Sequence, residues 1–171
     1  MIAKFCTLVD KLNNLTGKLV SFLIILINII VLFEIVARYF FNHPTIWVNE
    51  TSEMLFGAFF LLGGGYTLLH NHHVRIDILY NHVSDRSKDL LDLLSAIAIL
   101  GYMILFTWTA GDSAYESILL HERSQSVWAP YIFPIKLVVP IAGLLMILQA
   151  LSQLAVLVLK ITRRLNDQHV H

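Results

Sequence analysis

Residues 19–37 read LVSFLIILINIIVLFEIVA, an apolar run long enough to cross a membrane as one helix. A helix rises about 1.5 Å per residue, so about 20 residues cross the ~30 Å hydrocarbon core of a bilayer. Three similar runs follow, and we expect the four spans near residues 19–37, 50–70, 90–111 and 134–159. The sequence therefore predicts an all-α integral membrane protein, a single domain of four transmembrane helices over residues 1–171.

The composition also indicates a membrane protein. Hydrophobic residues make up 57% of the chain and charged residues only 14%, whereas soluble domains carry about 45–50% and about 25%. The formal net charge is zero, so we expect no nucleic-acid partner. Cys6 is the one cysteine, which excludes an internal disulfide and any metal site built from several thiolates.

The basic residues predict the orientation of the chain. Nine of the twelve lie before the first run, between the second and third, or after the fourth, and three lie in the other two connections. Lysine and arginine are enriched in cytoplasmic loops, so we expect both the N-terminus and the C-terminus in the cytoplasm. Segments 38–53 and 112–135 would then face the other side. The larger group is Lys4, Lys11, Lys18, Arg75, Arg86, Lys88, Lys160, Arg163 and Arg164, and the smaller is Arg38, Arg123 and Lys136.

The segment before the first span has a pattern of its own. Apolar residues recur there at helical spacing, while Lys4, Lys11 and Lys18 repeat every seven residues on another face. This pattern predicts a helix over residues 3–17. The helix either lies along the membrane interface, with its lysines near anionic headgroups, or extends the first span upstream.

Polar residues near the outer ends of the first two spans form the first candidate cluster. Glu34 lies four residues before Arg38, on the same helix face, so we expect an ion pair; a proton-relay role for Glu34 is the alternative. Asn28 suits a hydrogen bond between helices. Glu50 and Glu53 suit the first turn of the second span, and the alternative pairs one of them with Arg38 across the loop.

The second span carries three consecutive glycines, Gly63, Gly64 and Gly65. Small residues let transmembrane helices approach closely, which is the interpretation we favour. A hinge or an unwound segment is the alternative.

The stretch after the second span, residues 70–79, reads HNHHVRIDIL. Arg75 and Asp77 are two residues apart, so on a helix they face different ways and each needs another partner. The histidines invite a metal or haem interpretation, but the other three spans contain no histidine to complete a haem site. We therefore expect no metal and no cofactor in this chain.

The approach to the fourth span, residues 124–136, reads SQSVWAPYIFPIK. Pro130 and Pro134 make it irregular or first-turn helix, and Pro140 is expected to bend the span that follows. Lys136 is expected to extend its ammonium outward.

The sequence carries no phosphate-binding glycine loop, zinc-protease motif or serine-hydrolase motif, so we expect no enzyme activity. Charged residues gather at the ends of the spans, which favours an accessory membrane subunit. Two alternatives stay open: a small proton-coupled transporter that uses Glu34, and the membrane anchor of a redox enzyme.

Three motifs then resemble one known family. Residues 38–44, RYFFNHP, followed by Trp47 and Glu50, are similar to a pattern in the small membrane subunit of tripartite ATP-independent periplasmic (TRAP) transporters. Residues 73–77, HVRID, and the spacing of Ser126, Pro130 and Pro134 resemble two further blocks of that family. Lys136 departs from it, because an apolar or small residue is expected there.

The resemblance implies a subunit of a sodium-coupled uptake system for organic acids, such as sialic acid or dicarboxylates, in the bacterial inner membrane. A large membrane subunit would carry the substrate and sodium sites, and this chain would pack against its scaffold. A periplasmic substrate-binding protein would dock transiently, and membrane lipids would surround the complex.

The resemblance also assigns site residues. The outer polar cluster comprises Glu34, Arg38, Asn42, Trp47, Glu50 and Glu53. Arg75 and Asp77 would act on the inner face, with a phospholipid headgroup as one candidate partner. The approach to the fourth span contributes Ser126, Pro130, Pro134 and Lys136.

Overall fold

The computed structural model describes residues 2–70 and 85–168 and contains four long helices. They are α1 (Ile2–Tyr39), α2 (Val48–Leu69), α4 (Asp85–Leu119) and α5 (Phe133–Gln168). Each contains a window apolar enough and long enough to cross a membrane. The expected all-α fold with four candidate spans is therefore confirmed.

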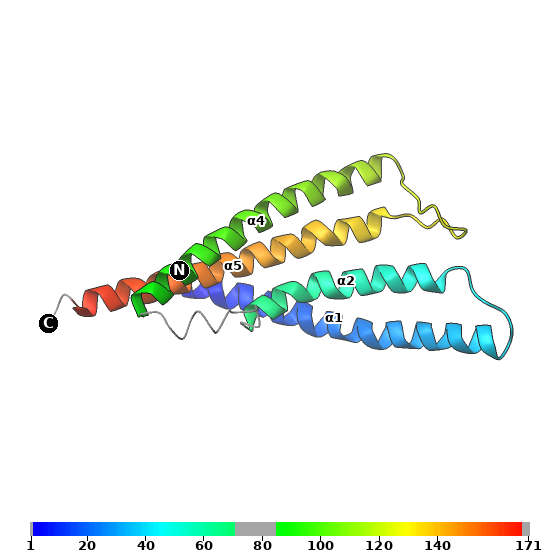
Figure 1. The fold of residues 1–171 in the computed structure, drawn as a ribbon, viewed down its shortest axis with the longest axis horizontal. Coiled ribbons are helices and arrows are strands. Elements are labelled where there is room, and N and C mark those ends of the chain that lie inside the picture. Colours follow the sequence, from blue (N-terminus) through cyan, green and yellow to red (C-terminus); the bar gives the residue numbers. More distant parts are fainter. Residues whose placement is uncertain (1, 71–84, 169–171) are drawn as a thin grey trace.

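The helices lie side by side in the order α4, α5, α2, α1, as an open fan (Figure 1). Extensive contacts join α4 to α5, α5 to α2 and α2 to α1, and α5 also contacts α1. The helices converge where the first half of α1 meets the middle of α5, and they spread apart toward the loops at residues 40–47 and 120–132 (Figure 1). Helices α1 and α2 form one helical hairpin, and α4 and α5 form the other. The two hairpins pack against each other through α5.

Helix α1 runs without interruption from Ile2 to Tyr39. The segment expected at residues 3–17 is thus continuous with the first span. Helix α5 likewise continues through Pro140. Helix α2 begins at Val48, which places Glu50 in its first turn, as the helix dipole favours.

The buried side chains are few, and most of them are small. Among the described residues, the buried apolar ones include Val9, Val20 and Ile27 of α1 and Ala142 and Ala150 of α5. Many large apolar side chains of α1 and α4 remain exposed. In the 18-residue window that marks the span in α4, no residue is buried. A surface of this kind suits contact with lipid or with another membrane protein.

Candidate functional site

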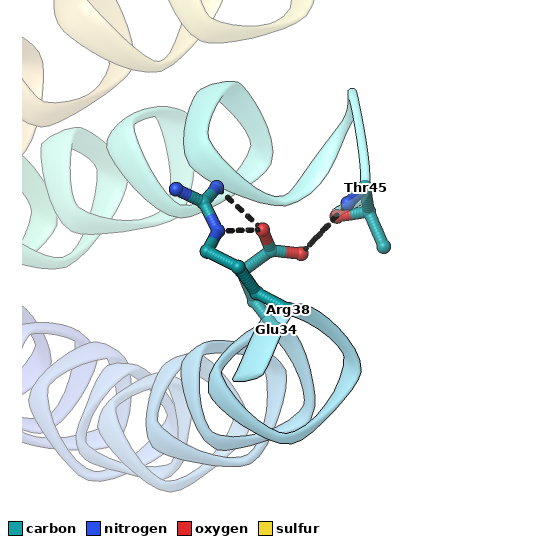
Figure 2. Close-up of polar contacts among 3 residues, drawn as sticks. All are labelled: Glu34, Arg38 and Thr45. Carbon is teal, nitrogen blue, oxygen red and sulfur yellow. Dashed lines mark hydrogen bonds and ion pairs between the residues drawn. The ribbon is translucent and has the colours of Figure 1, made fainter. Parts of the chain in front are cut away.

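Glu34 is the centre of the polar cluster at the end of α1. It is only 6% exposed, although its helix faces outward along much of its length. Arg38 donates to Glu34 Oε1 from Nε at 2.9 Å and from Nη2 at 2.6 Å. The backbone N–H of Thr45 donates to Oε2 at 3.1 Å, and the Thr45 hydroxyl donates to the same oxygen. The carboxylate thus lies between the guanidinium and the threonine, with both oxygens engaged (Figure 2).

The local sequence explains how Thr45 reaches Glu34. The chain leaves α1 through Asn42, whose φ of 50° lies in the left-handed region that asparagine tolerates. The N–H of His43 then donates to the Ala37 carbonyl at 2.9 Å, which folds the loop back over the helix end. Trp47, next to α2, stacks on Phe33 of α1 with ring centroids 6.2 Å apart. Glu34, Trp47 and this turn together fix the start of α2 against the end of α1.

The other acidic residues of the predicted cluster lie apart from Arg38. Glu50 Oε2 accepts a hydrogen bond of 2.5 Å from the hydroxyl of Ser126, in the loop before α5. Glu53 is exposed. Arg38 pairs with Glu34, so the ion pair in the structure follows the four-residue spacing within α1. The contact between Glu50 and Ser126 joins the loop ends of the hairpins α1–α2 and α4–α5, although 76 residues separate the two side chains.

The approach to α5 is an ordered loop. The N–H of Ser124 donates to the Pro130 carbonyl at 2.9 Å, and Ser126 Oγ accepts from the N–H of Ala129 at 3.1 Å. The guanidinium of Arg123 lies 4.1 Å from the centroid of the Tyr131 ring. Pro134 is the second residue of α5, a place where the missing N–H of proline costs nothing.

Lys136 pairs with a loop carboxylate. Its ammonium donates to Glu122 Oε2 at 2.5 Å. This hydrogen bond, with the positive charge behind it, holds the pKa of the Glu122 carboxyl below its usual range. The lysine that departs from the family pattern therefore joins the first turn of α5 to the beginning of the loop that follows α4.

Replacing Lys136 by glutamine is expected to return the pKa of Glu122 toward its ordinary value of 4.5. Because the pKa is lowered in the folded chain, the stability from this pair is complete above that ordinary value. It is lost as the pH falls through the lowered value. A carboxyl-carbon NMR titration of Glu122 measures the shift, with Lys160→Gln as control because Lys160 is exposed and far along α5. Identical titrations of wild type and Lys136→Gln would contradict the pairing.

A second polar network lies at the opposite end of the fan, where α1, α2 and α5 converge. Asn13 is 1% exposed, and its Nδ2 donates to Gln149 Oε1 at 2.8 Å. Gln149 Nε2 in turn donates to Asp10 Oδ1 at 3.0 Å. Gln153 Nε2 donates to the Leu68 carbonyl, near the end of α2. These amides connect three helices through hydrogen bonds.

The sequence reasoning missed this second network. The available signal was the presence of Gln149 and Gln153 inside an otherwise apolar run, because polar side chains within spans usually bond across helices. Asn13 gave a weaker signal, since it lies in a segment whose relation to the membrane was open. Its pairing with α5 depends on how the helices are arranged.

The glycine triplet lies in regular helix, because α2 continues from Val48 to Leu69. Gly65 is buried, and a Cβ built on it would collide with the side-chain oxygen of Asn13. A Cβ on Gly64 would lie 2.9 Å from Met146 Sδ, whereas one on Gly63 would meet nothing within 4 Å. Close helix packing thus accounts for Gly65, and Gly63 faces open space.

The predicted inner residues, Arg75 and Asp77, lie outside the described residues, as do His72 and His73. Within residues 2–70 and 85–168, no group of three or more His, Cys, Asp or Glu side chains is arranged to hold a metal ion.

Comparison with known proteins identifies the family of this chain. A relative from Vibrio cholerae serotype O1, the C4-dicarboxylate TRAP transporter small permease protein DctQ, is 24% identical over 120 residues. The match covers 70% of this chain and 46% of the relative, so the chain spans about half of that relative's length. A family model described as "Tripartite ATP-independent periplasmic transporters, DctQ component" matches residues 27–160. Both matches are transporter components and not enzymes. The chain therefore belongs to the DctQ component family of tripartite ATP-independent periplasmic transporters.

Proposed function

We propose that this chain is an accessory small permease subunit that packs against and stabilises the scaffold of the large membrane subunit of a TRAP transporter. The observation that carries the proposal is family membership combined with the open helical fan. The fan leaves many large apolar side chains of α1 and α4 exposed, which suits a chain that completes its packing against another membrane protein.

The arrangement of the polar groups supports a bracing role for this chain rather than a transport pathway within it. Glu34, a buried carboxylate, has both oxygens engaged by Arg38 and Thr45. Asn13 and Gln149 hold α1 to α5. A surface hollow of about 390 Å³ lies between α4 and α5 and is open to the outside. These features support the interpretation of this chain as a static bracing subunit and argue against a proton relay at Glu34.

The orientation in the membrane follows from the basic residues. We infer that both termini lie in the cytoplasm and that the loops at residues 40–47 and 120–132 lie in the periplasm. Ser126 and Arg123 lie in the second of these loops, and Glu50 lies just after the first, in the first turn of α2. These groups would help to dock the periplasmic binding protein. In intact cells, a cysteine placed at Ser126 should react with an impermeant thiol reagent, and one placed at Lys4 should not. The opposite labelling would reverse the orientation.

The name of the Vibrio cholerae relative supports C4-dicarboxylates as the transported class. Other organic acids, sialic acid among them, remain alternatives, since the residues that select substrate would lie on the large subunit and the binding protein. Sodium coupling is likewise assigned to the large subunit.

Co-expression with the large membrane subunit of its transporter tests the proposal. A tag on the large subunit should retain this chain through purification in mild detergent, and a tagged unrelated multi-pass transporter should not. Loss of the chain from the tagged large subunit, under conditions that keep both proteins folded, would contradict the bracing role.

A further inference from the structure

A polar side chain lies exposed in the middle of the first span. Asn28 is nine residues from either end of the span expected at residues 19–37, or about 14 Å along the helix. Its Nδ2 donates to the Ile24 carbonyl of its own helix at 2.6 Å. The described part of the chain provides no partner for the side-chain oxygen of Asn28. An amide facing hydrocarbon in this way is costly unless another molecule supplies a hydrogen bond.

Asn28 belongs to one row of α1. Residues seven apart lie on nearly the same face of a helix, and such a row of polar side chains comprises Thr7, Asn14, Ser21 and Asn28. All of them are exposed except Asn14, which is half-buried. The neighbouring row begins with three lysines and continues with apolar residues, all of them exposed: Lys4, Lys11, Lys18, Ile25 and Leu32. We call these two rows together the open polar face of α1.

Another face of α1 is already occupied. Asn13, Val20, Ile27 and Glu34 also repeat every seven residues, and all four are buried against the rest of the chain. At every step, the row that contains Asn28 lies one residue further along the chain than this buried row. One residue corresponds to a rotation of about 100° around the helix axis, so the two rows face different directions. The open polar face is therefore distinct from the face that packs within this chain.

We propose that the open polar face of α1 docks a transmembrane helix of the large membrane subunit. That helix carries a hydrogen-bonding side chain near the middle of the membrane, opposite Asn28, and carboxylates near the lysines at the beginning of α1. The inference rests on the proposed function and adds the surface and the chemistry of the contact. An interhelical hydrogen bond satisfies the amide, and opposite charges match the three lysines.

The charges favour a different protein over a second copy of this chain. In a symmetric dimer the same surface patch meets itself. Two copies in one membrane also have the same orientation, so Lys4, Lys11 and Lys18 would lie opposite their own counterparts at equal depth. Like charges placed together are unfavourable. Lipid tails, for their part, offer no hydrogen bond to Asn28.

The first test is Asn28→Leu, with Thr109→Val as the matched control. Thr109 is an exposed polar residue of α4 whose hydroxyl also bonds its own helix backbone. Asn28→Leu is expected to weaken binding to the large subunit about 3- to 30-fold, measured as dissociation of the purified pair in detergent. Thr109→Val should leave binding unchanged. Circular dichroism and the thermal midpoint of the isolated chain should be unchanged for both, because neither side chain is buried.

The second test maps the contact directly. The single cysteine, Cys6, is buried and is replaced by alanine. New cysteines at Ser21, Ile25, Asn28 or Leu32 are then labelled with a photoreactive maleimide, and one at Thr109 serves as control. Cross-links from the α1 positions to the large subunit support the proposal.

Two results would overturn the inference while leaving the proposed function intact: cross-linking only from Thr109 with full binding by Asn28→Leu, or cross-links that join two copies of this chain. Failure of the wild-type chain to bind the large subunit would overturn both.

Discussion

Gly65→Ala is expected to lower the free energy of unfolding by about 1–3 kcal/mol, the usual cost of forcing an extra group into a filled core. The added methyl group would collide with the side-chain oxygen of Asn13. Asn13 cannot move aside freely, because it is buried at 1% exposure and donates to Gln149. The substitution therefore strains the contact of α1, α2 and α5 where the fan converges.

The glycine triplet provides its own controls. Gly63→Ala should be neutral or slightly stabilising, since alanine favours helix over glycine by roughly 0.5–1 kcal/mol and nothing lies within 4 Å of the new atom. The stability of Gly64→Ala should lie between those of Gly63→Ala and Gly65→Ala, because the far end of the flexible Met146 side chain can move aside. Thermal unfolding in detergent, followed by circular dichroism, gives the ranking. If the triplet were a hinge, all three variants would keep their stability and lose uptake to a similar extent.

Arg38→Ala is expected to lower the free energy of unfolding, by less than the loss of one partner of a fully buried pair would. It leaves the carboxylate of Glu34, whose side chain is 9% exposed, without its cation. Removing one partner of a fully buried pair costs about 3–5 kcal/mol. The expected value is smaller because the Arg38 side chain is 44% exposed and Thr45 still donates to Glu34.

A double-mutant cycle isolates this pair. Adding Glu34→Gln to Arg38→Ala should recover part of the lost stability, because the neutral amide needs no cation. Arg123→Ala is the matched control, since Arg123 is exposed and stacks on Tyr131 in the other loop. Its effect should stay within about 1 kcal/mol. An Arg38→Ala variant as stable as Arg123→Ala would contradict a bracing role for this cluster.

The Arg38→Ala variant also distinguishes an effect on assembly of the transporter from an effect on substrate binding. In the complete transporter, Arg38→Ala should reduce uptake in proportion to the amount of assembled complex and leave substrate affinity unchanged. An intact complex with weakened substrate affinity would show that the cluster has a different role.

The sequence predicted the features that depend on one helix at a time. Hydropathy and length located the four helices, and the four-residue spacing brought Arg38 to Glu34. Both follow from the geometry of a single helix, which needs no knowledge of neighbouring elements. The identity of the family followed from short motifs in register along the chain.

The features that depend on how the helices meet could not be read in this way. The bond between Asn13 and Gln149 joins α1 to α5, and that of Ser126 to Glu50 joins the two hairpin ends. Neither pair is related by a local period, so only the packing of the fan reveals them. The packing likewise distinguishes Gly65, where an added Cβ would collide with Asn13, from Gly63, where it would meet nothing within 4 Å, although both are glycine in the sequence.

We propose that this chain braces a larger membrane protein and has no transport pathway of its own. The measurement is uptake of a radiolabelled C4-dicarboxylate by proteoliposomes under a sodium gradient, with the periplasmic binding protein present. Liposomes containing this chain alone should show no uptake above empty liposomes, whereas liposomes containing it together with the large subunit should accumulate the label. Gradient-driven accumulation by this chain alone would show that it has a transport pathway of its own.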